Sequence, residues 1–301
     1  MTTALTGCAV RRTHSVMKTH PPDIVYTSTL DQLLQQLNDR NAALESMTLI
    51  VQMSVSKGGS QQGVVKEYGD IKGYIIIGSP DQIRVILHYP LYGKFMDMVS
   101  DGKTFKMEDL LNSCVISGSD VVTNPAQKGL YSLRPAVILD SMLIRGFTRD
   151  DLVSMTQDSR IYENPKKKKD FIEEPDYDIE FLSSPQGQVA RTQRVLHVNR
   201  TNLLPYRQDI YNAEGKVATQ ATYSDYKKFG DISFPTKIVI QRPLDELGLT
   251  LTLTRATFNQ KLEADQFDLG PVPESYSTYN MDDPAVASTA PCVAHAPQST
   301  H

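Results

Sequence analysis

The sequence has no run of about 18 apolar residues, so it predicts no helix that crosses a bilayer. It is also short of the basic residues that nucleic-acid binding requires. The 31 Lys and Arg residues are outnumbered by 35 Asp and Glu residues, and no basic stripe is interleaved with aromatic side chains. Trp is absent, which alone excludes nothing. At 301 residues the chain is long enough to bury a substantial core.

Motifs that carry chemistry are missing as well. The sequence has no Gly-x-Ser-x-Gly elbow, no phosphate-binding loop, no Gly-x-Gly-x-x-Gly and no His-Glu-x-x-His. The histidines are scattered, and His88 and His197 fall in expected strands, where a structural histidine is the simpler interpretation. The carboxylates are spread over turns and strand exteriors. The sequence therefore predicts a protein without catalytic activity, cofactor or metal.

Cysteine is rare, with only Cys8, Cys114 and Cys292. Their spacing fits no metal site, and an odd number argues against a disulfide framework. Cys114 has apolar neighbours and is expected to be a small core residue. Cys8 ends Leu5-Thr6-Gly7-Cys8, which fits the bacterial lipobox, whose cysteine becomes lipidated; the alternative is a chance tetrapeptide. The residues before Cys8 are too few for an apolar signal segment of about 7–15 residues, so the lipobox interpretation implies an upstream start or a trimmed chain.

What the sequence does contain is apolar and polar residues alternating with a period of two, broken by Gly, Pro and Asp-Gly turns. One such region runs from Met47 to Met107, and a second from Asp178 to Phe258. This pattern is typical of antiparallel meanders. It predicts a mainly β (α+β) fold: an incomplete, strongly curved antiparallel β-barrel of about 11–12 strands, with a few helices covering an apolar concave face.

Two helices are expected to provide that cover. The first follows Ser28, the expected N-cap, and carries a leucine stripe. Its leucines are Leu30, Leu33, Leu34, Leu37 and Leu44. The second is short, begins after Arg134-Pro135 and is apolar around most of its surface.

The domain boundaries follow from composition. Residues 1–27 are polar, are broken by Pro21-Pro22 and suggest a lipobox remnant and flexible tether; residues 28–278 form the single domain. Residues 279–301 are rich in Ala, Pro, Ser and Thr and predict a disordered tail. Residues from about 148 to 175 suggest an irregular insertion. Its Lys166–Lys169 run is interpreted either as a solvated loop or as a contact with anionic head groups, at about 1 kcal/mol per lysine.

The order of these features resembles the bacterial LolA/LolB lipoprotein-localisation family, over about residues 30–269. The likeness rests on the lipobox, the polar tether, the leucine-rich helix and a strand that ends in Tyr-Pro-Leu-Tyr-Gly at residues 89–93. A short apolar helix after Arg134-Pro135 and a second meander complete it, the latter containing residues 198–207 and Phe234-Pro235. The resemblance implies an open barrel with a helical lid over an apolar cavity that receives acyl chains of lipoproteins, or phospholipid.

The residues that would line this cavity are Leu49, Val51, Met53, Ile75, Ile77, Val85, Leu87, Phe95, Met98, Leu139 and Met142. Alternatively, they fill a dry core. The family's lipidated receptor carries a membrane-inserting leucine in a Pro-Leu-Gly loop. Pro90, Leu91 and Tyr92 match that loop with Tyr92 inserted, so Leu91 is the candidate; a plain β-turn is the alternative.

The leading hypothesis is therefore a lipoprotein of the bacterial cell envelope, anchored in the outer membrane through lipidated Cys8 and facing the periplasm. It would bind acyl chains without catalysis and take part in lipoprotein sorting or insertion, with a periplasmic carrier protein as a further partner and no role for nucleic acid. One alternative is an envelope sensor or scaffold of the same fold that binds a partner protein. Another is an envelope hydrolase, for which the sequence offers no candidate site.

Overall fold

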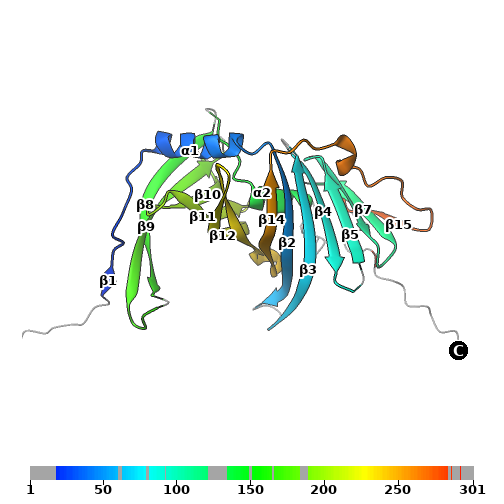
Figure 1. Cartoon of the computed structure of the whole chain (residues 1–301), viewed down its shortest axis with the longest axis horizontal. Helices are drawn as coiled ribbons and strands as arrows, with labels where there is room; N and C mark the ends of the chain where they lie inside the picture. Colours follow the sequence, from blue (N-terminus) through cyan, green and yellow to red (C-terminus); the bar gives the residue numbers. More distant parts are fainter. Residues whose placement is uncertain are drawn as a thin grey trace, which may run out of the picture.

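The computed structural model of the chain describes residues 18–59, 63–78, 81–91, 93–120, 134–148, 151–164, 166–183, 189–283, 286 and 292. These residues form fifteen β-strands, two α-helices and two short 3-10 helices (Figure 1). The strands are β1 (Thr19–His20), β2 (Ser46–Gly59), β3 (Val64–Gly78), β4 (Gln82–Tyr89), β5 (Gly93–Ser100), β6 (Thr104–Asp109), β7 (Cys114–Ser119), β8 (Leu152–Glu163), β9 (Phe171–Leu182), β10 (Thr192–Asn199), β11 (Leu204–Tyr211), β12 (Val217–Phe229), β13 (Ile232–Arg242), β14 (Leu247–Phe258) and β15 (Ser277–Asn280). The helices are α1 (Leu30–Ala42), α2 (Pro135–Met142), η2 (Pro243–Asp245) and η3 (Ala264–Phe267).

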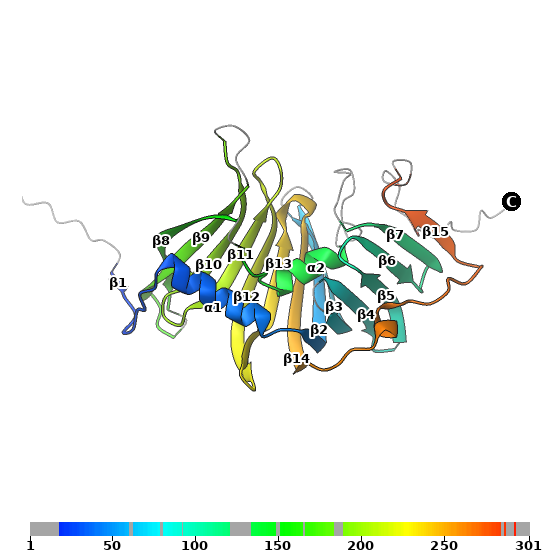
Figure 2. The same ribbon diagram turned by 90° about the horizontal axis from the view of Figure 1, so that it is seen from above.

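All the strands belong to one sheet that curls without closing (Figures 1 and 2). From β8 at one edge the order is β8-β9-β10-β11-β12-β13-β14-β2-β3-β4-β5-β6-β7-β15, and β1 pairs with the start of β9. Neighbours are antiparallel except for the β1–β9 and β7–β15 pairs, which are parallel. The incomplete, strongly curved barrel predicted from the sequence is confirmed, with fifteen strands instead of about 11–12.

One face of this sheet is apolar across the middle strands, and the strand registers show that the face is continuous. Directly opposed residues in neighbouring strands lie on the same face. One such row is Leu196, Gln208, Ala221, Ile240, Leu249, Val55 and Tyr68. Both hydrophobic core clusters of the described residues form on this face.

Helix α1 covers the β9–β10 part of the face. It begins after Thr29, which is the N-cap instead of the expected Ser28: Thr29 accepts a hydrogen bond from the Gln32 backbone, and the Gln32 side chain accepts one from Thr29. Leu33 and Leu37 are buried in the cluster that β9 and β10 supply. The leucine stripe therefore packs as predicted.

Helix α2 covers the central strands. Ile138, Leu139 and Met142 belong to the main core cluster. Two hydrogen bonds tie the helix backbone to the sheet: Gln208 Nε2 donates to the Asp140 carbonyl and the Tyr223 hydroxyl to the Ser141 carbonyl, both at 2.9 Å. Figure 2 shows both helices lying across the sheet.

The prediction of an irregular insertion at about 148–175 is wrong for residues 152–163, which form β8. This strand pairs along the whole of β9, from Leu152 opposite Leu182 to Glu163 opposite Phe171. Because β8 is an edge strand and largely exposed, no apolar alternation marks it in the sequence. Lys166–Lys169 lie exposed in the following turn, where Lys167 faces Asp170 at 3.8 Å, which agrees with a solvated loop.

The expected tether and tail also need correction within the described residues. Thr19 and His20 pair with β9, and the Tyr26 amide donates to the Arg200 carbonyl at 2.8 Å, so residues 18–27 follow the sheet. In the expected tail, β15 pairs with β7, and Met281 is buried in the core. Cys8 and its lipobox lie outside the described residues.

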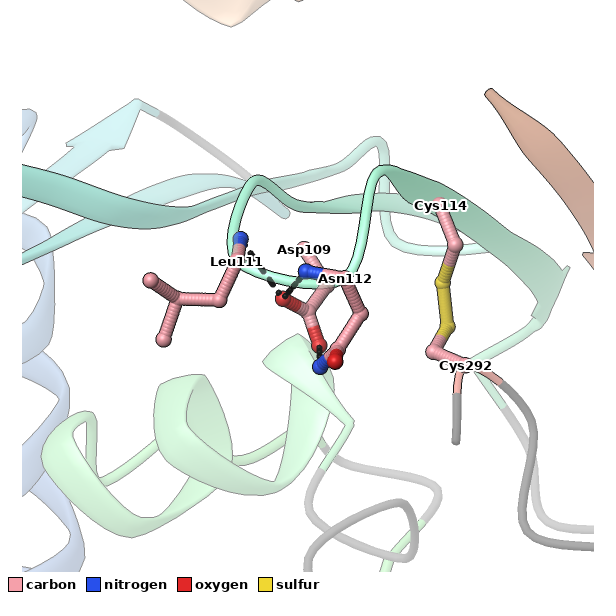
Figure 3. The surroundings of a disulfide bond; sticks show 5 residues. All are labelled: Asp109, Leu111, Asn112, Cys114 and Cys292. Atoms are coloured by element: carbon pink, nitrogen blue, oxygen red, sulfur yellow. Dashed lines mark hydrogen bonds between the residues drawn. A yellow bond between two sulfur atoms is a disulfide. The ribbon is translucent and has the colours of Figure 1, made fainter. Parts of the chain in front are cut away.

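A disulfide joins Cys114, at the start of β7, to Cys292 (Figure 3). The expectation that three cysteines argue against a disulfide was therefore wrong, although Cys114 does lie in the core as expected. The two residues are 178 positions apart, so the bond constrains the unfolded chain strongly. It holds Cys292 against the start of β7.

We expect Cys292→Ser to lower the free energy of unfolding by about 2–4 kcal/mol, because the cross-link no longer restricts the unfolded chain. Thermal and urea unfolding would measure the change. A reductant should lower the stability of the wild-type protein by a similar amount and leave the stability of the variant unchanged. Cys8→Ser is the matched control and should unfold like wild type. Equal stability of all three proteins would contradict a structural role for the bond.

Candidate functional site

An apolar cavity of about 300 Å³ lies between the concave face and α2, on the half of β2 that is farther from α1. Six strands and the helix contribute to its wall. The lining residues are Met53, Val55, Lys57, Tyr68, Ile71, Leu87, Tyr89, Phe95, Met96, Met98, Met107, Asp109, Ile138, Leu247 and Leu249.

The cavity exists because α2 crosses the strands over only part of their length. A helix is about 10–12 Å wide, whereas the fourteen residues of β2 extend over about 46 Å, so α2 covers only part of the strands that it crosses. Leu139 and Met142 fill the core beside it, and only Ile138 of α2 faces the cavity. The remaining length of the concave face is left without a covering element among the described residues.

The side chains of the cavity wall can adjust to ligands of different shape. Four of its residues are methionines, whose flexible thioether side chains conform to varied ligand shapes. They are Met53, Met96, Met98 and Met107. Tyr89 and Phe95 stack on each other with ring centroids 4.2 Å apart.

The structure divides the eleven residues that were expected to line the cavity. Four of them line it: Met53, Leu87, Phe95 and Met98. The other seven are buried in the main core cluster: Leu49, Val51, Ile75, Ile77, Val85, Leu139 and Met142. All eleven share the concave face or α2, but the sequence could not show where the helix stops covering the sheet.

Several lining residues were missed by the sequence reasoning. The alternation in β2 continues from Met53 to Val55 and Lys57, and this signal was available. Leu247 and Leu249 come from β14, which pairs with β2 although it lies far along the chain. The sequence pattern does not indicate that pairing. Tyr89 ends β4 beside Pro90, and the turn residues there hid it, whereas Tyr68 lies within β3 opposite Val55 and was expected in a strand but not on the cavity wall.

Exposed apolar side chains surround this end of the sheet. β2, β4, β6 and β13 run in the same direction, so the turns that follow them meet at one end of the barrel. These turns and strand ends carry Val64, Val65, Tyr68, Leu91, Leu111 and Leu244. Leu91 is 91% exposed, and Pro90 is exposed beside it, whereas Tyr92 lies outside the described residues. We call these six residues the apolar rim.

Two charged side chains lie on the cavity wall, Lys57 and Asp109. Asp109 caps the β6–β7 turn: its carboxylate accepts hydrogen bonds from the Leu111 and Asn112 amides, both at 3.1 Å, and from the Asn112 side chain at 2.7 Å (Figure 3). Lys57 is exposed at the end of β2. The Asp109 carboxylate is therefore engaged by the turn, whereas the Lys57 ammonium is exposed at the end of β2.

The opposite face of β9–β12 carries a polar cluster centred on His197. His197 Nδ1 lies 2.6 Å from Asp178 Oδ1, and Nε2 lies 3.4 Å from Asp209 Oδ2. Burial lowers the pKa of His197, but the hydrogen bonds with these carboxylates outweigh it and raise the pKa to about 9. Burial opposes ionisation of Asp209 too, yet His197 and Arg207 lower its pKa to about 2. The histidine is thus a charged, structural residue, as expected from the sequence.

Other kinds of site find no support in the part of the chain that the structure describes. Within it, no group of three or more His, Cys, Asp and Glu side chains has an arrangement that could hold a metal ion. None of the described helices combines the length and apolar character needed to span a membrane.

Comparison with known proteins identifies solved structures of similar fold. A model of a family described as "uncharacterized protein" matches residues 132–270, less than half of the chain. No curated protein is significantly similar in sequence.

Solved structures with a similar fold include a DUF1329 family protein from Desulfovibrio piger, at 12% identity and a TM-score of 0.51, covering 80% of this chain and 96% of that one. A LolA superfamily protein from Nitrosomonas europaea (16% identity, TM-score 0.49, 80% and 98% coverage) also matches. So does a putative outer membrane lipoprotein-sorting protein domain from Vibrio parahaemolyticus (10%, 0.49, 78% and 94%). The structural neighbours thus include the group expected from the sequence, and the likeness is one of fold.

The pKa of His197 predicts how stability depends on pH. Because its pKa is about 9 in the folded protein and about 6.5 in the unfolded chain, its contribution is complete below pH 6.5 and is lost as the pH rises through about 9. This contribution amounts to about 3 kcal/mol. Urea unfolding between pH 6 and 10 should show the decline. His197→Gln and Asp178→Asn should both flatten it, and a slope unchanged in both variants would contradict this account.

Proposed function

We propose that this chain is a lipoprotein of the bacterial cell envelope that binds acyl chains in the cavity beneath α2 and takes part, without catalysis, in lipoprotein sorting or insertion at the outer membrane. The observation that carries the proposal is an apolar cavity, rich in methionine, that is bordered by exposed apolar turns. The DUF1329 protein supports the shared fold. The printed name of the Vibrio parahaemolyticus domain links that protein to lipoprotein sorting.

The physical basis of binding is transfer of methylene groups from water to the cavity wall. Each buried methylene contributes about 0.8 kcal/mol, so a single acyl chain binds without requiring a charged partner. Ligand sites of this kind are mostly apolar with a few polar groups, which agrees with the two charged residues on the wall. Phospholipid and the acyl chains of lipoproteins are the proposed ligands, and lipidated Cys8 is the proposed anchor.

We assign the transfer of bound lipid to a membrane or a carrier protein to the apolar rim. Leu91, at the tip of the β4–β5 turn, is the most exposed large hydrophobic residue described and is the proposed membrane-inserting side chain. Its neighbours on the rim share the same end of the sheet, so a bilayer or a periplasmic carrier protein would meet them together. A ligand then passes between the bilayer and the cavity over a short apolar path.

A partner-binding scaffold is the second candidate, and one observation favours it. β8 is a twelve-residue edge strand, and no described strand pairs with its outer edge. The backbone groups on such an edge can pair with an added strand of another protein. If the folded protein took up no lipid, partner binding would become the favoured function.

Met53→Gln should weaken lipid uptake by about tenfold or more, because it places an amide without a partner on an apolar wall. The protein would be the full chain carrying Cys8→Ser, with co-purified and added lipid measured by native mass spectrometry. Met155→Gln, a change of the same kind under α1 and away from the cavity, is the matched control. A clean ligand-free mass with no uptake by folded protein would refute the acyl-binding proposal.

Leu91→Glu should leave lipid uptake from solution unchanged but slow transfer to phospholipid vesicles by about tenfold, since a carboxylate opposes insertion into the bilayer. Ile161→Glu, which changes an exposed residue on β8, is the control and should transfer at the wild-type rate. A fluorescent acyl chain and quencher-loaded vesicles would report the rate. If both variants transferred equally fast, Leu91 would not be the inserting residue.

A further inference from the structure

Two lysines lie opposite each other just beyond the cavity. Lys57 of β2 and Lys66 of β3 are directly opposed in the antiparallel register. Opposed residues share a face, with Cβ atoms about 4.5–5.5 Å apart. Lys57 lines the cavity, and Tyr68, two residues from Lys66 along β3, lines it as well. Both lysines therefore belong to the concave face at the cavity opening.

This pairing is unfavourable by itself. Like charges directly opposite each other in a sheet destabilise it. Neither ammonium group forms an ion pair with a carboxylate of the described residues. Lys94, Lys167 and Lys261 are the described lysines that form ion pairs with carboxylates. The lysine pair thus concentrates positive charge where the apolar wall ends.

Two carboxylates lie near this opening and bear on its charge. Asp109 is held by the three hydrogen bonds of the β6–β7 turn. Glu246 lies beside Gly59, where a Cβ atom on the glycine would come within 2.9 Å of the Glu246 carboxylate. The Asp109 carboxylate is engaged by its turn, and each lysine ammonium carries three donors that can bind an incoming anion.

We infer that the cavity takes the acyl chain of an anionic amphiphile, whose carboxylate or phosphate head group is held between the Lys57 and Lys66 ammonium groups. This inference rests on the proposed acyl-binding function and narrows its ligand. An apolar wall that leads to a pair of point charges matches a molecule with one apolar chain and one negative end. A fatty acid has that form, and an acidic phospholipid adds a second acyl chain to the same combination, whereas a chain with a neutral head group gains nothing from the lysines.

The test compares three ligands with the same chain: dodecanoate, dodecyl phosphate and dodecanol. Each would displace the neutral fluorophore N-phenyl-1-naphthylamine from the delipidated full chain carrying Cys8→Ser. The two anions should bind about five- to tenfold more tightly than the alcohol at low salt, and the ratio should shrink at 0.5 M salt through screening.

Substitutions assign that preference to the pair. Lys57→Gln with Lys66→Gln should abolish the preference for anions, so that dodecanoate, dodecyl phosphate and dodecanol compete for this variant with similar affinity. Lys57→Arg with Lys66→Arg should retain the preference, because the charge is kept. Lys227→Gln with Lys228→Gln removes two exposed lysines of β12 and is the matched control, expected to behave like wild type.

The outcomes separate this inference from the proposed function. Equal affinity for all three ligands, or a preference that survives the double glutamine change, would overturn the anionic head-group site and leave acyl binding intact. Failure of all three ligands to bind would refute acyl binding, and the inference with it. Stabilisation by inorganic phosphate alone, lost in the glutamine variant without any amphiphile binding, would show an anion site unrelated to lipid and would also overturn the inference.

Discussion

The structure depends on one constraint: a curled sheet that does not close has an apolar concave face, and that face must be covered. Two helices meet this need unequally. Helix α1 seals the β9–β10 end, where Leu33 and Leu37 complete a dry cluster. Helix α2, with eight residues, seals only part of the central strands. The cavity is the part of the concave face that remains, and its apolar wall follows from the same alternation that makes the core.

The two faces of the sheet are separated in chemistry as well as in space. On the concave side the wall changes from methionine and leucine to a pair of lysines at its end. On the other face, His197 lies between two aspartates and is held in its charged form. The first arrangement leaves cations open to an outside anion, and the second satisfies its cation internally. Only the first therefore suits a ligand, while the second stabilises the sheet.

Much of the architecture could be predicted from the sequence because period-two alternation dictates which residues share a face. β2 and the leucine stripe of α1 are examples, and both pack as expected. β8 was missed because an exposed edge strand needs no apolar alternation, and the Cys114–Cys292 bond because nothing local relates residues 178 positions apart. The eleven residues expected to line a cavity share the concave face or α2, but only four of them line the cavity described here, because its position depends on where α2 crosses the strands and on the pairing of β14 with β2.

The pairing of β2 with β14 also determines the order in which the protein can be assembled. These strands form the middle of the sheet, yet Met47 must wait for Phe258, more than two hundred residues later, before its strand gains a neighbour on that side. During synthesis, the meander from β2 to β7 therefore carries an open edge and an uncovered apolar face. Contacts this distant in sequence make folding slow and leave the growing chain open to aggregation. The meander therefore needs protection from aggregation until nearly all of the chain has emerged.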